Sequence, residues 1–374
     1  MIDFALEAKD RETAARAGRL STPHGEVPTP VFMPVGTHAA VRALTPEQLR
    51  QTGARIVLAN TYHLALRPGP EVVRKAGGLH GFMAWSGPIL TDSGGYQVFS
   101  LPRKEISAEG VCFASELDGK KILLTPELAI ELQHALGADI IMPLDECTPH
   151  PATRKLAARG VSHSLAWLER CIAAHGDGAQ ALFGIVQGSV YPDLRRACAE
   201  AMVKLDLPGY AIGGVSVGEG LELLKRIVAA TAPQLPSERP RYLMGVGLPE
   251  DLLESIALGM DMFDCVIPTR FARSATLFTR RGRIRMTHRR YRRDFYPIEP
   301  GCACYACGDF TRAYLHHLYR SNEILGTILG AIHNVSFYQT LMTQAREAIL
   351  AGRFLHFKTA FLSEYGAPDA AAPD

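Results

Sequence analysis

Several familiar signals are missing from this sequence, and each absence excludes a class of protein. No run of about 18 or more apolar residues occurs, so we do not expect a membrane span. No glycine-rich loop ends in Lys-Ser or Lys-Thr, and no H-E-x-x-H motif occurs, which excludes P-loop nucleotide hydrolases and zinc peptidases of that type. Gly245-Val246-Gly247 lacks the third glycine of a dinucleotide-binding fingerprint. Residues 1–20 contain acids and no apolar stretch, so we expect no secretory signal and a cytoplasmic location.

Charge is nearly balanced over the whole chain but strongly concentrated in one place. The 374 residues carry a net charge of only +2, so affinity for nucleic acid would have to come from a local cluster. Such a cluster is present, since eight of the fourteen residues from Arg280 to Arg293 are Arg. This density is incompatible with a packed interior and leaves two interpretations, a solvated face or a phosphate-binding surface.

Short apolar runs that end in small or polar residues recur along the chain, with amphipathic segments between most of them. Thr45-Pro46-Glu47 and Thr125-Pro126-Glu127 have the hydroxyl, proline and acid that begin helices, and Leu248 opens a further helix expected to reach Gly259. Eight buried-type strands that alternate with helices predict a parallel (β/α)8 barrel of the TIM type, with a doubly wound open sheet as the lesser alternative. The predicted strands are Val31–Gly36, Arg55–Asn60, Pro88–Ser93, Asp139–Asp145, Ala181–Gln187, Tyr210–Val215, Arg241–Val246 and Met262–Ile267.

The barrel prediction brings a set of polar residues together. Active sites of such barrels form where the strands end and the following loops begin. Each residue alone could be a helix cap or an ordinary loop residue, but six polar positions at six strand ends favour a common site. These positions are Asp92, Asp145, Gln187, Gly213-Gly214, Met244-Gly245 and Asp264.

Asp264 is the most unusual of these residues because it lies inside the apolar sequence MFDCVIPTR, Met262–Arg270. A carboxylate in such surroundings is costly unless something pairs with it or the protein uses it. The arginine-rich block follows in the same part of the chain. A candidate nucleophile therefore lies close in sequence to a candidate site for a polyanion.

A second pattern is typical of a metal site. Cys302, Cys304 and Cys307 form C-x-C-x-x-C, and His333 follows in a stretch, Leu315–Asn334, that is expected to be helical. Three thiolates and one imidazole complete a tetrahedral Zn²⁺ site and leave no position for water, so the predicted zinc is structural. His316 and His317 are alternative fourth ligands, and three free cytosolic thiols are the alternative to a metal. Cys112, Cys171 and Cys198 are expected to be packing residues, because disulfides are not expected in this context.

The residues described above belong to longer motifs that follow one another along the chain. These motifs are TDSGGYQVFSL (91–101), MPLDECTPHPA (142–152), GIVQGS (184–189), AIGGVSVGE (211–219), MGVGLPEDLL (244–253) and MFDCVIPTR (262–270), followed by the C-x-C-x-x-C…His set. In this order, from about Phe4 to Phe361, the chain resembles the tRNA-guanine transglycosylases, also called queuine tRNA-ribosyltransferases, and specifically the bacterial type. The resemblance implies a single barrel domain over residues 1–374, with a basic and zinc-binding insertion at 280–340, and a homodimer.

The resemblance also implies a reaction. The family exchanges guanine at wobble position 34 of tRNAs with a GUN anticodon (those for Asp, Asn, His and Tyr) for a 7-deazaguanine. By match to the motifs, Asp264 would attack C1′ of the ribose and form a covalent tRNA intermediate. Asp92 would protonate the leaving guanine and deprotonate the incoming base. Two carboxylates and a covalent intermediate follow the logic of a retaining glycosidase.

Residues for base recognition carry over in the same way. Asp145 would bind N1 and the exocyclic amine, Gln187 and the Gly214 N–H would read O6, and Tyr96 and Met244 would sandwich the base. Plain core packing is the alternative for Tyr96 and Met244. The Val215 carbonyl would accept a bond from an aminomethyl group, with Glu219 orienting that peptide. Ser93 and Cys147 are also expected at the base, and Cys147, Ser216 and Val217 fit the bacterial pattern, whose free base is preQ1 (7-aminomethyl-7-deazaguanine).

Arginines near the nucleophile are the candidates for contacts to the anticodon. We expect Arg270 and Arg273 to read bases beside position 34, and Arg289 and Arg290 to bind phosphate. Phe271 departs from the small or polar residue common in the family. Two other classes of function remain: a related base-exchange enzyme or hydrolytic glycosylase acting on DNA, and a non-catalytic zinc-containing RNA-binding subunit. The presence of both Asp92 and Asp264 argues against the subunit.

Overall fold

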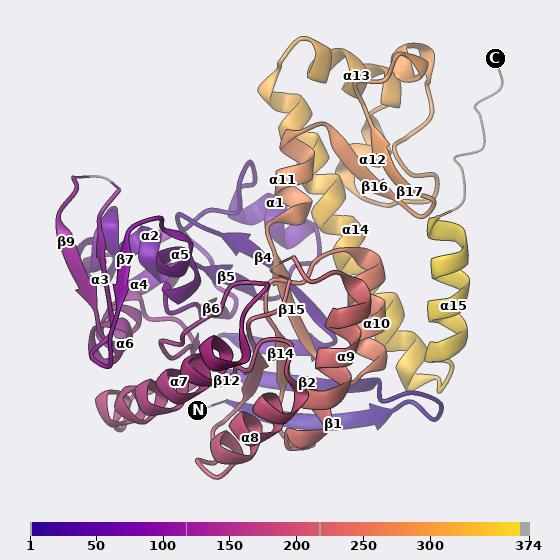
Figure 1. Cartoon of the computed structure of the whole chain (residues 1–374). Coiled ribbons are helices and arrows are strands. Elements are labelled where there is room, and N and C mark those ends of the chain that lie inside the picture. Colours follow the sequence, from indigo (N-terminus) through magenta and orange to yellow (C-terminus); the bar gives the residue numbers. More distant parts are fainter. Residues whose placement is uncertain (1, 117, 217, 367–374) are drawn as a thin grey trace.

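Parallel strands form the centre of the molecule, surrounded by helices (Figure 1). The computed structural model describes residues 2–116, 118–216 and 218–366. The sheet has the strand order β11-β10-β6-β5-β4-β15-β14-β13-β12. These strands are β4 (Val31–Gly36), β5 (Val57–Ala59), β6 (Ile89–Thr91), β10 (Ile140–Ile141), β11 (Ala181–Leu182), β12 (Gly184–Val186), β13 (Tyr210–Ile212), β14 (Arg241–Leu243) and β15 (Met262–Cys265).

The two edge strands of this sheet are one segment of the chain. Only Phe183 separates β11 from β12; its N–H donates to the carbonyl of Ile141 on one side, and Gly184 N–H donates to Gly209 on the other. The sheet therefore closes on itself, with eight strand positions. The predicted barrel is confirmed and the open sheet is wrong. Each barrel strand lies within a predicted run, and most are shorter than predicted. Most of the polar residues at the carboxyl ends of the predicted runs lie beyond the ends of the observed strands.

Helices follow the strands as predicted, and their starts use the expected chemistry. The Thr45 hydroxyl accepts a bond from Gln48 N–H, and the Thr125 hydroxyl accepts one from Leu128 N–H. The helices are α1 (Pro46–Gln51), α2 (Thr61–Leu66), α3 (Pro70–Lys75), α4 (Gly78–Phe82), α5 (Gly95–Ser100), α6 (Pro126–Leu136), α7 (Arg154–His175), α8 (Pro192–Val203), α9 (Leu221–Thr231), η1 (Ala232–Gln234), α10 (Pro249–Ala257), α11 (Ile267–Arg273), η2 (Arg289–Arg293), α12 (Tyr305–Asp309), α13 (Arg312–Arg320), α14 (Ile324–Leu350) and α15 (Phe354–Tyr365). No helix among the described residues has the length and apolar character needed to cross a membrane.

Three antiparallel sheets add to the barrel. They consist of β1 (Asp3–Lys9), β2 (Arg16–Thr22) and β3 (Gly25–Thr29); of β7 (Lys104–Ile106), β8 (Val111–Ala114) and β9 (Lys121–Leu124); and of β16 (Thr276–Thr279) and β17 (Gly282–Arg285). The first sheet covers the amino ends of the barrel strands. Leu20 and Val27 from this sheet are buried together with the apolar residues inside the barrel. Its turn also brings His24 against Asp139, which directly precedes β10.

His24, His80 and Asp139 form a compact cluster at this amino end. The His24 Nδ1 lies 2.7 Å from one oxygen of Asp139, and the His80 Nε2 lies 3.3 Å from the other. The two imidazole rings stack with their centroids 3.5 Å apart. Each imidazole contacts its own oxygen of Asp139, so the cluster links the turn after β2 and helix α4 to the start of β10.

The C-terminal part of the chain forms a lobe with its own hydrophobic cluster, built from β16, β17, η2, α12, α13 and the start of α14. Figure 1 shows these elements together at one end of the long helix α14. The helix expected over Leu315–Asn334 is interrupted: α13 ends at Arg320 and α14 begins at Ile324. Asn322 lies between them with a φ of 56°, a left-handed conformation that ends a helix.

Candidate active site and metal centre

A cavity of about 400 Å³ opens at the carboxyl ends of the barrel strands. The predicted polar positions at the strand ends line it, so the structure brings together residues from six strands. Its lining includes Asp92, Ser93, Tyr96, Asp145, Cys147, Gln187, Gly213, Gly214, Val215, Met244, Gly245, Asp264 and Arg270. This is the end of a (β/α)8 barrel at which active sites form.

Asp264, near the carboxyl end of β15, directs its carboxylate into the cavity. Its Oδ1 accepts a hydrogen bond from the Tyr242 hydroxyl at 2.6 Å and another from Gly245 N–H at 2.8 Å. Burial raises the pKa of Asp264, and these two hydrogen bonds oppose the rise. The donors are neutral, so they orient the carboxylate without neutralising its charge. Such a group is suited to meet a positive centre in the cavity.

Asp92 follows β6 and is held by three donors from neighbouring segments. Asn60 Nδ2 donates to Oδ2 at 2.5 Å, Thr61 N–H donates to Oδ1 at 2.8 Å, and Gln97 Nε2 donates to Oδ2 at 3.0 Å. Burial raises the pKa of Asp92 to about 6 despite these bonds, and the nearby charge of Asp264 adds to the rise. A carboxyl group with this pKa exchanges a proton readily near neutral pH, as a general acid and base must.

Asp145 and Gln187 form a hydrogen-bonded pair deeper in the cavity wall. The Gln187 Nε2 donates to Asp145 Oδ2 at 2.6 Å, and both residues are buried. Burial raises the pKa of Asp145 to about 6, with the charge of Asp92 contributing. The Gln187 Oε1 is buried without a hydrogen-bond partner among the described residues. The pair offers the cavity a carboxylate acceptor beside an amide donor, the two kinds of group that the edge of a guanine requires.

The segment after β13 supplies backbone groups to the same cavity. Glu219 accepts a hydrogen bond from Ser216 N–H, which belongs to the same peptide group as the Val215 carbonyl. Burial raises the pKa of the Cys147 thiol in the same cavity to about 12, so that thiol stays protonated. Val217 lies outside the described residues, so its place in the bacterial pattern stays a prediction.

Tyr96, Met244 and Ser93 complete the predicted base-binding set. Tyr96 is 58% exposed at the cavity, which is unusual for an aromatic side chain that only fills a core. Met244 is partly buried and lines the same space. Ser93 is buried, and its hydroxyl accepts a bond from Gly95 N–H at 3.3 Å. Core packing is therefore a poor description of Tyr96.

The predicted arginines fall into two groups. Arg270 lines the cavity, and Arg273 lies on the same helix, α11. Arg289 and Arg290 are exposed on η2, in the C-terminal lobe, and all eight arginines of the 280–293 block are exposed. Phe271 stacks on Phe278, with ring centroids 5.6 Å apart, so this departure from the family pattern serves packing within the structure.

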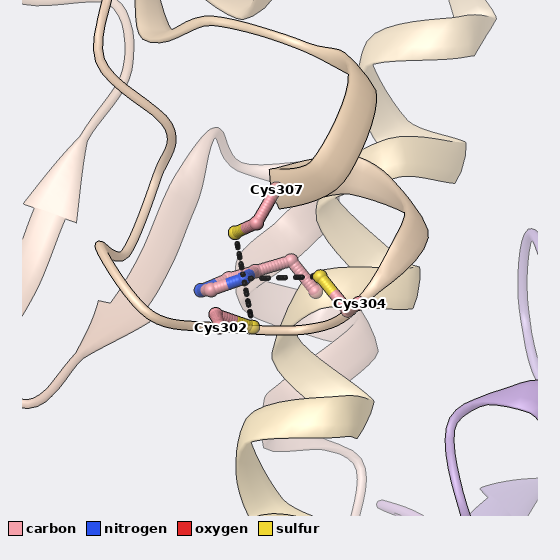
Figure 2. Close-up of side chains that lie close together, drawn as sticks. Cys302, Cys304 and Cys307 are labelled. Carbon is pink, nitrogen blue, oxygen red and sulfur yellow. Dashed lines mark hydrogen bonds between the residues drawn. The ribbon is translucent and has the colours of Figure 1, made fainter.

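The C-x-C-x-x-C motif and His333 come together in the lobe. Figure 2 shows the sulfur atoms of Cys302, Cys304 and Cys307 turned toward one another. The His333 Nδ1 lies 4.0, 3.7 and 3.3 Å from these three sulfurs in that order. Its Nε2 lies 2.6 Å from the carbonyl of Phe278, which fixes the proton on Nε2 and leaves the Nδ1 lone pair free for a ligand. The four residues could hold a metal ion. His316 instead bonds the Met286 carbonyl through Nδ1 at 2.7 Å.

Comparison with known proteins agrees with this geometry. The family model described as queuine tRNA-ribosyltransferase matches residues 10–367. Among curated relatives, the queuine tRNA-ribosyltransferase of Pelotomaculum thermopropionicum is 53% identical over 97% of this chain and 99% of its own length. The protein of the same description from Thermosynechococcus vestitus is 56% identical over 96% of this chain and 95% of its own length. The chain belongs to the queuine tRNA-ribosyltransferase family. It is therefore an enzyme, a pentosyltransferase.

Several residues at the enzyme's site were not predicted from the sequence. Asn60, Thr61 and Gln97 hold Asp92, and Tyr242 holds Asp264. A signal for Asn60 was available in the sequence. Asn60 is a polar residue at the end of the predicted strand Arg55–Asn60, the same kind of position that pointed to Asp92. Tyr242 carries no such signal, because it lies within an apolar strand where an inward-facing tyrosine looks like core.

Proposed function

We propose that this enzyme exchanges guanine at wobble position 34 of tRNAs with a GUN anticodon for preQ1, through a covalent tRNA–Asp264 intermediate, in the biosynthesis of queuosine. The observation that carries the proposal is the pairing of Asp92 and Asp264 in one cavity. One carboxyl group has a pKa of about 6, and the other is oriented by neutral donors toward the same space. Family membership supports the ribosyl transfer.

The two carboxyl groups divide the reaction into two displacements. Asp264 attacks C1′ of the ribose and forms an ester as the C1′–N9 bond breaks, while protonated Asp92 gives its proton to the leaving guanine. Guanine departs and the new base enters. Asp92, now ionised, removes the proton from N9 of the incoming base, which attacks C1′ and releases Asp264. Two inversions at C1′ give overall retention, as in retaining glycosidases.

The cavity wall supplies the groups that would select a guanine-type base. Asp145 accepts from N1 and the exocyclic amine, while the Gln187 amide and Gly214 N–H donate to O6. Tyr96 and Met244 lie against the faces of the base once it has left the anticodon stack. For preQ1, the Val215 carbonyl accepts from the aminomethyl group. The bond from Ser216 N–H to Glu219 supports this role because it orients the Val215 peptide.

The arginines would hold the tRNA. We assign Arg270 and Arg273, beside the cavity, to the bases flanking position 34, and Arg289 and Arg290 to phosphates. The logarithm of the tRNA-binding constant falls as the logarithm of the salt concentration rises. Replacing Arg289 and Arg290 by Ala should make this fall shallower, by about 0.7–0.9 in slope for each phosphate that the variant no longer neutralises. An unchanged slope in a filter-binding titration would leave these arginines as a solvated face.

The metal bound by Cys302, Cys304, Cys307 and His333 is proposed to be Zn²⁺, because three thiolates and one imidazole suit that ion and its tetrahedral geometry. When bound, it would connect the loop of the C-x-C-x-x-C motif to α14 and stabilise the lobe. It would supply no chemistry to the cavity. Elemental analysis should find one zinc per chain, and Cys304→Ser should lower that content. We also propose a cytoplasmic homodimer, which sedimentation analysis tests.

An exchange assay tests the function as a whole. Transfer RNA for Tyr carrying labelled guanine at position 34 should lose its label when preQ1 is added, without accumulating abasic tRNA. Queuine should compete poorly. Net abasic product would indicate a hydrolytic glycosylase, exchange into DNA would indicate the related DNA enzyme, and tRNA binding without exchange would indicate a non-catalytic subunit.

A further inference from the structure

Arg195 is a fully buried cation whose hydrogen bonds all go to backbone carbonyls. It extends from α8 to the carboxyl ends of β12 and β13 and is 0% exposed. Its Nε donates to Ser189 at 2.7 Å, its Nη1 donates to Val186 at 3.2 Å and to Gly213 at 2.9 Å, and its Nη2 donates to Gly214 at 3.2 Å. Burial lowers the pKa of Arg195 to about 10, which still leaves it charged at neutral pH.

Two of these carbonyls belong to peptide groups at the base-binding wall. The Gly213 carbonyl shares its peptide group with Gly214 N–H, and the Gly214 carbonyl shares its own with Val215 N–H. A cation that binds a peptide oxygen draws electron density from the group, so the N–H at the other side becomes a stronger donor. The charge of Arg195 therefore acts on Gly214 N–H through one peptide, although the guanidinium itself does not line the cavity.

The surrounding glycines are shaped to this arrangement. A Cβ on Gly188, where φ is +145°, would lie 2.7 Å from Arg195 Cγ. A Cβ on Gly214, where φ is +62°, would lie 2.4 Å from Gln187 Oε1. A side chain at Gly188 would displace the Arg195 side chain, and one at Gly214 would push its backbone away from the Gln187 amide. Glycine at both positions therefore allows Arg195 and Gln187 to pack closely against the backbone.

We propose that Arg195 is a positioning residue that fixes the Gly213–Val215 backbone and strengthens Gly214 N–H as the donor to the 6-oxo group of the base. This inference rests on the proposed function, and it adds a determinant of specificity behind the contact residues. The substrate class it selects is a purine or 7-deazapurine with a strong hydrogen-bond acceptor at position 6.

The test compares guanine with 6-thioguanine as the incoming base, in exchange against tRNA labelled with guanine. Both bases keep N1–H and the 2-amino group, and they differ in acceptor strength at position 6. We expect the wild-type enzyme to prefer guanine in kcat/KM. Arg195→Met should reduce this preference by up to roughly fivefold, because Gly214 N–H remains as a weaker donor and a whole hydrogen bond of ordinary strength is worth about that factor. Arg195→Lys keeps the charge but not the planar guanidinium, so its preference for guanine should lie between those of the wild type and Arg195→Met.

Arg16→Lys is the matched control, because Arg16 is also buried but lies at the amino end of the barrel. It should lose stability and keep the wild-type preference. If Arg195→Met does not fold, a reduced preference in Arg195→Lys decides the matter. A wild-type preference in the folded Arg195 variants would overturn the inference while leaving the exchange function intact. Failure of the wild-type enzyme to exchange guanine would refute the proposed function itself.

Discussion

Asp261 and Asp264 lie three residues apart at the two ends of one strand, and their surroundings are opposite. Asp261 precedes β15 at the amino end of the barrel and is fully buried. The Nε and Nη2 of Arg16 each donate to one of its carboxylate oxygens at 2.8 Å, and the backbone N–H of Arg241 donates to Oδ2 at 2.7 Å. Asp264 opens into the cavity, and its donors among the described residues, Tyr242 and Gly245, are neutral.

The same contrast separates Asp139 from Asp92 elsewhere in the barrel. Burial alone would raise the pKa of Asp139, but its contacts with His80, His24 and Ile89 N–H together lower it. Burial raises the pKa of Asp92 to about 6. Asp139 and Asp261 thus receive their partners from within the fold, which they help to hold together, whereas Asp92 and Asp264 line an open cavity.

The largest expected effect is the loss of exchange in Asp264→Asn. The amide cannot form the ester with C1′, so we expect kcat to fall on the order of 10⁴-fold or more, with little change in thermal stability. The measurement is incorporation of labelled guanine into tRNA, together with a denaturing gel for the covalent adduct. An adduct that persists in this variant would identify another nucleophile.

Asp261→Asn should instead damage the fold and spare the chemistry. Removing the charge leaves Arg16 buried without its carboxylate, which we expect to cost about 3–5 kcal/mol of unfolding free energy. Urea denaturation measures the loss, and kcat per folded molecule should remain near the wild-type value. A large loss of kcat with unchanged stability would break the contrast between the two ends of the strand.

The pH dependence of stability should have opposite signs for Asp92 and Asp139. Asp92 has a folded pKa of about 6, above its ordinary 3.8, so its ionisation destabilises the fold as pH rises from about 4 through 6. Relative to Asp92→Asn, the wild type should therefore lose about 2 kcal/mol of unfolding free energy over that window. Urea denaturation of both proteins at a series of pH values measures this difference. The contributions of the other carboxyl groups largely cancel, because both proteins contain them.

Asp139→Asn is the counterpart for this measurement. Because the folded pKa of Asp139 lies below 3.8, its stabilising contribution is present above that pH and is lost as pH falls through the folded value. The wild type should exceed this variant in stability from pH 5 to 8, with the advantage shrinking below about pH 4. The same sign of pH dependence for both variants would contradict the contrast between Asp92 and Asp139.

Tyr242→Phe should have the smallest effect. Removing the hydroxyl takes one donor from Asp264, so we expect kcat/KM to fall about tenfold and its acidic limb to move to higher pH. Tyr210→Phe, on the neighbouring strand β13, is the control. The Tyr210 hydroxyl accepts from Leu207 N–H, away from the cavity, and its loss should affect stability alone. Equal losses of kcat/KM in both variants would argue for a general packing effect.

The sequence predicted the barrel well because each strand is a short apolar run ending in polar residues, a local signal. It predicted the cluster of Cys302, Cys304 and Cys307 because metal-binding thiols occur at short, characteristic spacings. Spacing left His316 and His317 open as alternatives to His333, and the fold brings His333 to the three sulfurs. The break at Asn322 was missed, since helix patterning continues across it. Asn60, Tyr242 and Arg195 were missed because their partners lie on other strands, and only the barrel brings those strands together.

By itself, the sequence determined which chemical groups reach the carboxyl ends of the strands, because strand alternation and strand ends are local properties of the chain. Tertiary structure alone decided how those groups behave. Asp261 and Asp264 are the same residue type in one short segment, and nothing local distinguishes an acid neutralised by Arg16 from one held by Tyr242. The distinction depends on burial and on donors brought from distant segments, which together determine the pKa and the direction of each carboxylate.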